Sequence, residues 1–484
     1  MAGDTVSAGL GRANLWDLLA SRPYAALLLI CLLVWLPGFF SLPVLDRDEA
    51  RFAQSSKQMV ESGDWVNIRF GQAPRYKKPA GIYWLQAVAT ESLGRPPYTA
   101  IWTYRLPSLL GALAAVFLSF WCFQALAPPK AALAAAMLLG LSLGVSAEAH
   151  IAKTDAMLLA CTVAAQSVLL RIYLRARAQA SPPPLPLILL GWTAVAAGIL
   201  IKGPVILGVL ALSALGVSVW DREWGWLKQS RPWPGIALML ALIAPWFVAI
   251  GFVSHGQFFV RALGHDFAAK LAGGQESHGA PPGYYLLLST LTLWPATIGV
   301  LPGLSRAFAW RDSPGLRFVL SWAIGSWLMF AIVPTKLPHY ILPVYPALAA
   351  LSALWLADQG PRGRWENAFR IAAAIQFAVG AIILGAAISY APTRFGSGTP
   401  IWLLGLSATG IFAGLVAAYQ VWREQRGQAL LAAILAALIF YPSLMWGTAP
   451  RLQRIWLSPR LARIVERNRR PDDPPIIVSG YDEP

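Results

Sequence analysis

The sequence predicts an all-α protein that crosses a membrane many times. Of its 484 residues, 57% are hydrophobic and only 13% are charged, which is too little charge to cover the surface of a soluble domain. Apolar runs of about 18 residues or more recur along almost the whole chain, and each can cross a hydrocarbon core of roughly 30 Å. Both observations predict a polytopic membrane protein.

About thirteen apolar runs have the length of a transmembrane helix. The number is open by one or two, because only Lys202-Gly203-Pro204 separates two neighbouring runs. We expect one membrane domain over residues 1–446 and a tail, 447–484, that is too short for a core of its own. The runs lie at 23–40, 105–126, 131–148, 156–174, 185–201, 203–220, 235–253, 284–304, 316–334, 340–357, 370–390, 400–421 and 428–446.

The composition argues against several other classes of protein. The net charge of +16 does not indicate a nucleic-acid binder, because most basic residues lie in short loops, where they orient helices and meet anionic headgroups. Cys31, Cys122 and Cys161 show no paired spacing, so neither a disulfide framework nor a cysteine metal site is indicated. The first apolar run lacks a small-residue cleavage site after it, so we interpret it as a retained helix.

The basic loops predict how the chain is oriented. They alternate along the sequence, and by the positive-inside rule they face the cytoplasm together with the N-terminus. The loops 41–104 and 254–283 and the tail then face outward, with most of the unusual polar groups. A transporter would instead place ionisable groups through the middle of the bilayer. The orienting residues are Arg171, Arg175, Arg177, Arg222, Lys228, Arg231, Arg306, Arg311, Arg317, Arg362, Arg364, Arg370, Arg423 and Arg426.

The first outward loop opens with a predicted amphipathic helix in "LDRDEARFAQSSKQMVESGDW". Asp46 can cap this helix, and the Glu49 carboxylate can reach back to the Asp46 amide. Phe52 and Met59 fall on one face, and Gly63 is a natural stop. We therefore expect an amphipathic juxtamembrane helix that lies on the membrane surface.

Two charged pairs in this loop indicate a site for a phosphate-bearing lipid. Asp48 and Arg51, three residues apart, share a helix face and can point at one ligand. In "APRYKKPAGIYWLQA", Lys77 and Lys78 precede a helix start at Pro79, where the dipole and the exposed amides favour an anion. Two alternatives stay open: a solvated helix with capping acids, and lysines that only contact lipid phosphates.

Two further motifs lie at the outward boundary. "AHIAKTDAMLLA" places Lys153 and Asp155 at the mouth of a span, where Asp155 can also serve merely as a helix cap. "VPTKLPHYILPVYPAL" gathers prolines around Lys336, His339 and Tyr340, and such a segment exposes backbone groups that a cavity or protein must satisfy. The alternative for this motif is a kinked helix pair with aromatic anchors.

The outward loop 254–283 has two interpretations. Its histidines and acids can bind a divalent metal ion, although their spacing matches no established ligand pattern. We favour a lid over the site, because two glycines and two prolines supply hinges. The potential metal ligands are His265, Asp266, Glu276 and His278, and the hinges are Gly273-Gly274 and Pro281-Pro282.

Four of the outward segments, in their order along the chain and on one side of the membrane, resemble motifs of the polyprenyl-phosphate-sugar glycosyltransferases of the GT-C superfamily. They are "LDRDEARFAQSSKQMVESGDW", "APRYKKPAGIYWLQA", "AHIAKTDAMLLA" and "VPTKLPHYILPVYPAL". The nearest branch is the ArnT-like aminoarabinose transferases, which modify lipid A and are similar in turn to protein O-mannosyltransferases. The resemblance covers roughly residues 20–360. It implies a bacterial inner-membrane enzyme with a periplasmic site, an undecaprenyl-phosphate-linked sugar as donor, and inversion at the anomeric carbon.

The resemblance also assigns roles to individual residues. Asp48 matches the catalytic carboxylate of the first loop, and Asp155 matches a second important acid. Arg51 and Lys78 match residues that hold the carrier phosphate. The remaining residues expected at the donor site are Lys336, Tyr340 and Tyr83, the last of which we also expect as an aromatic at the membrane interface.

Two departures from the ArnT-like pattern leave the sugar and the acceptor open. Lys77 stands where that branch often has an acid, and the outward C-terminal region is much shorter. We expect lipid A or lipopolysaccharide as acceptor, with a protein O-mannosyltransferase-like activity as one alternative and a lipid or sugar flippase as another. The sequence does not decide metal dependence.

Overall fold

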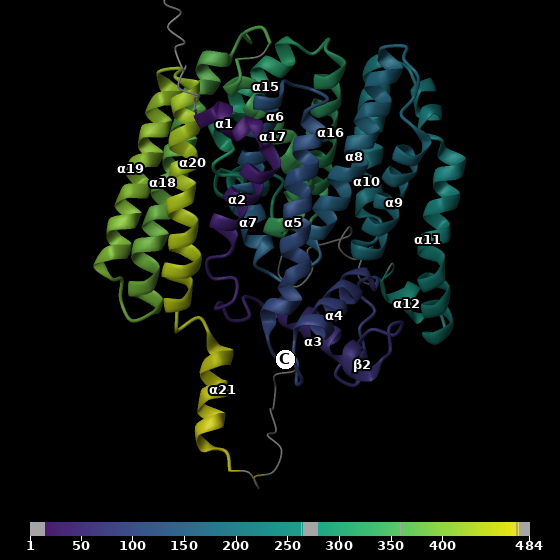
Figure 1. Ribbon diagram of the computed structural model, residues 1–484, viewed down its shortest axis with the longest axis vertical. Helices are drawn as coiled ribbons and strands as arrows, with labels where there is room; N and C mark the ends of the chain where they lie inside the picture. The colour runs from purple at the N-terminus through teal and green to yellow at the C-terminus, as the bar shows by residue number, and fades with distance from the viewer. Residues whose placement is uncertain (1–14, 263, 265–278, 359, 471–472, 474–484) are drawn as a thin grey trace, which may run out of the picture.

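The computed structural model describes residues 15–262, 264, 279–358, 360–470 and 473. Its helices run side by side in one bundle (Figure 1). Among the described residues, nine helical segments are long and apolar enough to cross a membrane. The all-α polytopic architecture is therefore confirmed. The nine segments are α5 (Ile101–Phe123), α8 (Asp155–Arg177), α9 (Leu185–Lys202), α11 (Pro232–Val253), α16 (Pro314–Ile332), η3 with α17 (Pro338–Leu356), α18 (Glu366–Phe395), α19 (Ile401–Trp422) and α20 with η4 and η5 (Arg426–Arg451).

The other four expected spans are shorter or broken. The run at 131–148 consists of α6 (Pro129–Gly140) and α7 (Leu143–Ala149), which are bent by 60° and make a tenth span if counted together. The run at 284–304 is divided between α14 (Tyr284–Thr292) and α15 (Thr297–Ala309). The two remaining runs form the short apolar helices α2 (Pro23–Trp35) and α10 (Val205–Asp221).

The first loop folds into a small layer at one end of the bundle. Figure 1 shows α3 (Arg47–Ser62), α4 (Gly81–Leu93) and the second strand together at the end where α21 (Leu457–Asn468) projects. The strands β1 (Arg69–Phe70) and β2 (Ala73–Pro74) pair antiparallel. The remaining short elements are α1 (Leu15–Ser21), η1 (Gly225–Ser230), α12 (Gln257–Phe259), η3 (Pro338–Val344), α17 (Tyr345–Leu356), α20 (Arg426–Pro442), η4 (Ser443–Thr448) and η5 (Ala449–Arg451).

The predicted amphipathic helix is present as α3. Asp46 caps it by accepting a hydrogen bond from the Glu49 amide at 2.7 Å, and Gly63 ends it with a left-handed φ of 67°. Its apolar face does not rest on lipid, because Phe52 and Met59 are buried in a cluster shared with α4 and the ends of α8 and α9. This layer is therefore a part of the folded protein.

Tyr83 also differs from expectation. The sequence places it among interfacial aromatics, but its side chain is completely buried. Its hydroxyl accepts a hydrogen bond from Nε of Arg75 at 3.1 Å, and its ring lies 5.3 Å from that of Phe52. Tyr83 thus joins α4 to α3, because a buried tyrosine needs a polar partner for its hydroxyl.

Two glycines allow the elements of this end to approach closely. A Cβ on Gly81, the first residue of α4, would lie 2.7 Å from the carbonyl oxygen of Leu200 in the last turn of α9. A Cβ on Gly111 of α5 would lie 2.8 Å from the backbone nitrogen of Met157 in the first turn of α8. Real Cβ atoms essentially never approach a backbone atom this closely, so both contacts depend on glycine.

Candidate functional site

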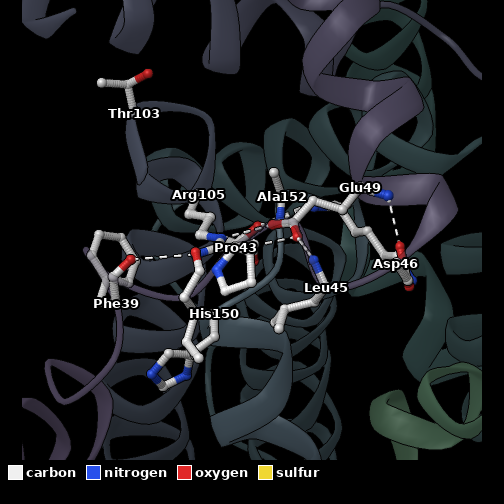
Figure 2. A network of polar contacts seen from close by, with 12 residues as sticks. Phe39, Pro43, Leu45, Asp46, Glu49, Thr103, Arg105, His150 and Ala152 are labelled. Atoms are coloured by element: carbon white, nitrogen blue, oxygen red, sulfur yellow. Dashed lines mark hydrogen bonds and ion pairs between the residues drawn. The ribbon is translucent and has the colours of Figure 1, made fainter. Parts of the chain in front are cut away.

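The acidic start of α3 is held by a buried ion pair between Glu49 and Arg105 (Figure 2). Nε and Nη2 of Arg105 donate to the two carboxylate oxygens of Glu49 at 2.7 and 3.0 Å. Both side chains are completely buried. Arg105 also donates to the carbonyl oxygens of Leu42 at 2.9 Å and Pro43 at 2.6 Å, so one guanidinium binds both the approach to α3 and its first turn.

Glu49 has different partners from those of a simple capping box. Its carboxylate accepts from the Leu45 amide at 2.6 Å rather than from the Asp46 amide. It also accepts from the amide of Ala152 at 2.9 Å, in the turn between α7 and α8. The predicted reciprocal cap is therefore wrong for Glu49, because a buried guanidinium supplies a stronger partner than a single backbone amide.

Asp46 connects α3 to the "AHIAKTDAMLLA" motif. Its second carboxylate oxygen forms an ion pair with Nζ of Lys153, whose side chain is only 8% exposed. Burial by itself lowers the pKa of Lys153, but the carboxylates of Glu148 and Asp46 outweigh it and raise that pKa. Lys153 therefore stays charged and joins two motifs that lie about 100 residues apart in sequence.

A second cluster surrounds Asp155, the first residue of α8. Its carboxylate forms an ion pair with Nζ of Lys202, the last residue of α9, and both side chains are nearly buried. The imidazole of His339 lies with Nε2 at 3.9 Å from Asp155 and Nδ1 at 3.7 Å from Glu148. Three segments distant in sequence thus meet in one polar cluster.

The aromatic face of Tyr340 completes this cluster. Nζ of Lys202 lies 4.8 Å from the centre of the Tyr340 ring, within the range of a cation–π contact. The ring of His339 is 5.0 Å from it and nearly perpendicular. The cluster brings together two predicted site residues, Asp155 and Tyr340, through a lysine that the motifs did not include.

Asp48 and Arg51 form a separate pair on α3. Nη1 of Arg51 lies 3.7 Å from Oδ1 of Asp48, and the Asp48 side chain is 43% exposed whereas that of Arg51 is 18% exposed. The predicted shared face is confirmed. The Asp48 carboxylate is thus the accessible member of the pair, two residues beyond Asp46.

The other predicted residues occupy separate positions. Lys78 is half-buried and precedes α4, whose N-cap residue Ala80 makes no side-chain capping bond. Lys336 is buried and donates from Nζ to the carbonyl oxygen of Val333 at 2.6 Å. Burial lowers the pKa of Lys336. Tyr83 packs against Phe52 of α3.

Sequence reasoning missed Lys202 and Glu148 as site residues. Lys202 entered the sequence analysis only as a break between two apolar runs. Glu148 is the single acid of its run and ends an otherwise apolar stretch. The sequence did contain one signal for both residues: each is an isolated charge at the end of an apolar run. Such charges usually have a partner, so they indicate a polar site.

The metal hypothesis concerns residues outside the described part of the chain, because His265, Asp266, Glu276 and His278 all lie there. Within the part that the structure describes, no group of three or more His, Cys, Asp or Glu side chains is arranged to hold a metal ion. The proposed lid likewise falls mainly on residues 265–278, outside that part.

Comparison with known proteins finds relatives in sequence. Residues 22–260 match the family model of dolichyl-phosphate-mannose-protein mannosyltransferases. An undecaprenyl phosphate-alpha-4-amino-4-deoxy-L-arabinose arabinosyl transferase of Aeromonas salmonicida is 28% identical over 366 residues, which cover 74% of this chain and 64% of the relative. A second such transferase, from Pseudomonas fluorescens, is 30% identical over 321 residues, covering 64% of this chain and 55% of the relative.

The fold is also found among solved structures. ArnT from Cupriavidus metallidurans, crystallised with undecaprenyl phosphate, superposes with a TM-score of 0.74 at 21% identity, covering 95% of this chain and 83% of that one. In sequence, the chain spans less than two thirds of the length of the first relatives that it matches. The predicted resemblance is confirmed: this chain is similar in sequence to aminoarabinose transferases and shares the fold of ArnT.

Proposed function

We propose that this protein is an inverting membrane glycosyltransferase that moves a sugar from an undecaprenyl-phosphate donor to lipid A or lipopolysaccharide. One observation carries the proposal: Asp155, Lys202 and Tyr340 cluster at the same end of the bundle as the accessible Asp48–Arg51 pair. In such a site, the positive charges can bind the phosphate of the donor, and the carboxylates and the aromatic ring can contact its sugar. The activity named for the Aeromonas and Pseudomonas relatives supports the same chemistry.

The proposal includes an orientation and a compartment. About thirteen apolar runs would cross the bacterial inner membrane, with the N-terminus in the cytoplasm and α3 and α4 in the periplasm. The alternation of basic loops supports this arrangement. The donor would then meet the site at headgroup level, where a polyprenyl phosphate presents its sugar.

The carrier phosphate is the leaving group, so its growing negative charge must be stabilised. Arg51 and Lys78 are suited to this role, because charge-assisted hydrogen bonds strengthen where water is excluded. The uncapped amides at the start of α4 add donors beside Lys78. Lys336 and Tyr340 would line the donor site, and Lys202 would add a positive charge that Asp155 holds in place.

The transfer breaks the bond between the anomeric carbon and the phosphate oxygen and forms one to an acceptor oxygen. If the acceptor is a hydroxyl, Asp48 takes its proton as the oxygen attacks. If the acceptor is an ionised lipid A phosphate, it has no proton to lose, and Asp48 would orient it or stabilise positive charge on the sugar. Asp155 acts through Lys202 in either case.

A second candidate is a protein O-mannosyltransferase-like enzyme. The match of residues 22–260 to the mannosyltransferase family model favours it, and the basic Lys77 and short C-terminal region leave the acceptor open. A flippase would need functional ionisable groups deep within the spans. Analysis of lipid A, envelope glycans and secreted proteins from a deletion strain by mass spectrometry distinguishes these three.

The activity is tested in membranes supplied with radiolabelled undecaprenyl-phosphate sugar. We expect Asp48→Asn and Lys78→Ala each to reduce transfer by at least about 100-fold, the scale of a lost general base or charge stabiliser. Matched controls are Glu61→Gln and Lys57→Ala, which remove a partly exposed i, i+4 pair from α3 and should leave transfer unchanged. Full activity of both site variants would refute the proposed site.

A further inference from the structure

Helix α21 presents an apolar stripe that the described part of the molecule does not cover. Leu457, Leu461 and Ile464 follow the helical period of three to four residues, and their side chains are 61%, 60% and 50% exposed. Among the described residues, α21 buries none of its side chains. Figure 1 shows this helix projecting from the end of the bundle below α20. A stripe of this kind in water requires a partner.

A row of arginines flanks the apolar stripe. Arg460, Arg463 and Arg467 recur at the same helical spacing and share one side of α21. With Arg454 they line a cavity of about 590 Å³ along one side of the helix. Guanidinium groups recognise phosphate in two-pronged hydrogen bonds, so the charge of this row complements an anionic headgroup.

The base of α21 lies at an aromatic girdle. Trp402 and Trp446 are exposed neighbours with ring centres 6.4 Å apart, and the Arg451 guanidinium lies 5.2 Å from the Trp402 ring. Trp456, directly before α21, donates from its indole to the carbonyl oxygen of Ala449 at 2.6 Å. Tryptophans collect at the boundary between lipid and water, so α21 begins at the level of the headgroups.

We propose that α21, which projects from the end of the bundle in the structure, docks on the membrane surface and there binds anionic phospholipid headgroups through Arg460, Arg463 and Arg467. Its apolar stripe enters the boundary of the acyl chains, as in other interfacial amphipathic helices, and the arginine stems extend along lipid to reach phosphate. A second copy of α21 fits this surface less well, because it would bring two arginine rows together. The inference does not depend on the proposed transferase activity.

The full-length protein, reconstituted in lipid nanodiscs, provides the test. A nitroxide on Leu461→Cys reports depth through its relaxation by oxygen, and one on Glu466→Cys reports the opposite side of the helix through a water-soluble nickel chelate. Cys31 and Cys122 are buried, and wild-type protein labelled in parallel supplies the background. Discs contain either phosphatidylcholine alone or phosphatidylcholine with phosphatidylglycerol.

We expect the label at position 461 to be shielded from water in anionic discs, while the label at 466 stays accessible. Replacing Arg460, Arg463 and Arg467 by Gln should lower the ratio of docked to undocked helix about fivefold per arginine, and about 1 M salt should act in the same direction. Equal loss of charge at exposed positions outside α21, through Arg175→Gln, Arg222→Gln and Arg364→Gln, should change nothing.

Three results would overturn the proposal. The label at position 461 could be equally wetted in both kinds of disc, or its depth could be unaffected by the triple Gln substitution. Strong coupling between labels on two copies of the protein would instead assign the apolar stripe to self-association. Since α21 contributes no buried side chain to the described part of the bundle, loss of the whole fold is not an expected outcome of these substitutions.

Discussion

Asp155 and Lys202 form an ion pair between the first residue of α8 and the last residue of α9, 47 positions apart in sequence. Only 9% of the lysine side chain and 5% of the aspartate side chain are exposed. Neither charge can therefore rely on water for solvation. The pair places an ammonium group beside the Tyr340 ring, at the centre of the proposed donor site.

We predict that Lys202→Met destabilises the protein by about 3–5 kcal/mol, because it leaves a buried carboxylate without its partner. The double variant Asp155→Asn, Lys202→Met should regain much of that stability, since neither buried charge remains. It should still transfer no sugar if the ammonium group binds donor phosphate. Thermal unfolding in detergent and the labelled-donor assay separate the two effects, and an active double variant would contradict the assigned role.

The Glu49–Arg105 pair should stabilise the protein as strongly as the Asp155–Lys202 pair does, because it holds α3 in position. Glu49→Gln removes the charge that two guanidinium nitrogens contact, and we expect it to lower the free energy of unfolding by about 3–5 kcal/mol. Glu61→Gln on the exposed side of the same helix should change it by less than about 0.5 kcal/mol. Chemical denaturation of both variants in the same detergent makes the comparison; equal effects would show that the buried pair has no special weight.

Close packing of α5 on α8 predicts the effect of a single methyl group. Gly111→Ala places a Cβ 2.8 Å from the backbone of Met157, two residues after Asp155. We expect a loss of about 1–3 kcal/mol from overpacking, with reduced transfer because Asp155 is displaced. Gly405→Ala is the control, since no described heavy atom within 4 Å would meet its Cβ. Its stability should be unchanged or slightly higher.

Lys153 should contribute to stability over a wide range of pH. Its pKa is raised above the ordinary value of 10.5 by Glu148 and Asp46, which outweigh the effect of burial. The contribution is therefore fully present below about pH 10 and is lost only as pH rises through the still higher folded-state pKa. The Lys153 ammonium group should therefore stay protonated between about pH 6 and pH 9, which NMR of protein labelled with ¹⁵N-lysine checks directly. Deprotonation of Lys153 within this interval would mean that its folded-state pKa is not raised.

The sequence predicted the site unevenly, for identifiable reasons. The sequence was sufficient to predict the Asp46 cap, the Gly63 stop and the shared face of Asp48 and Arg51, because each depends on residues within one or two helical turns. It was not sufficient to predict the partners of Glu49, since Arg105 and Ala152 are 56 and 103 positions away. Tyr83 was placed at the lipid interface because its amphipathic ring suits that position as well as a buried one.

By itself, the sequence determined that this chain is a helical membrane protein and that its unusual charges gather near the ends of its spans. Apolar length and local charge are sufficient for both, because the hydrocarbon core tolerates few other arrangements. Only the tertiary structure decided that Lys202 meets Asp155, that Glu49 meets Arg105, and that α3 rests on protein instead of lipid. Those contacts depend on which helices lie side by side, and hydrophobic length carries no information about neighbours.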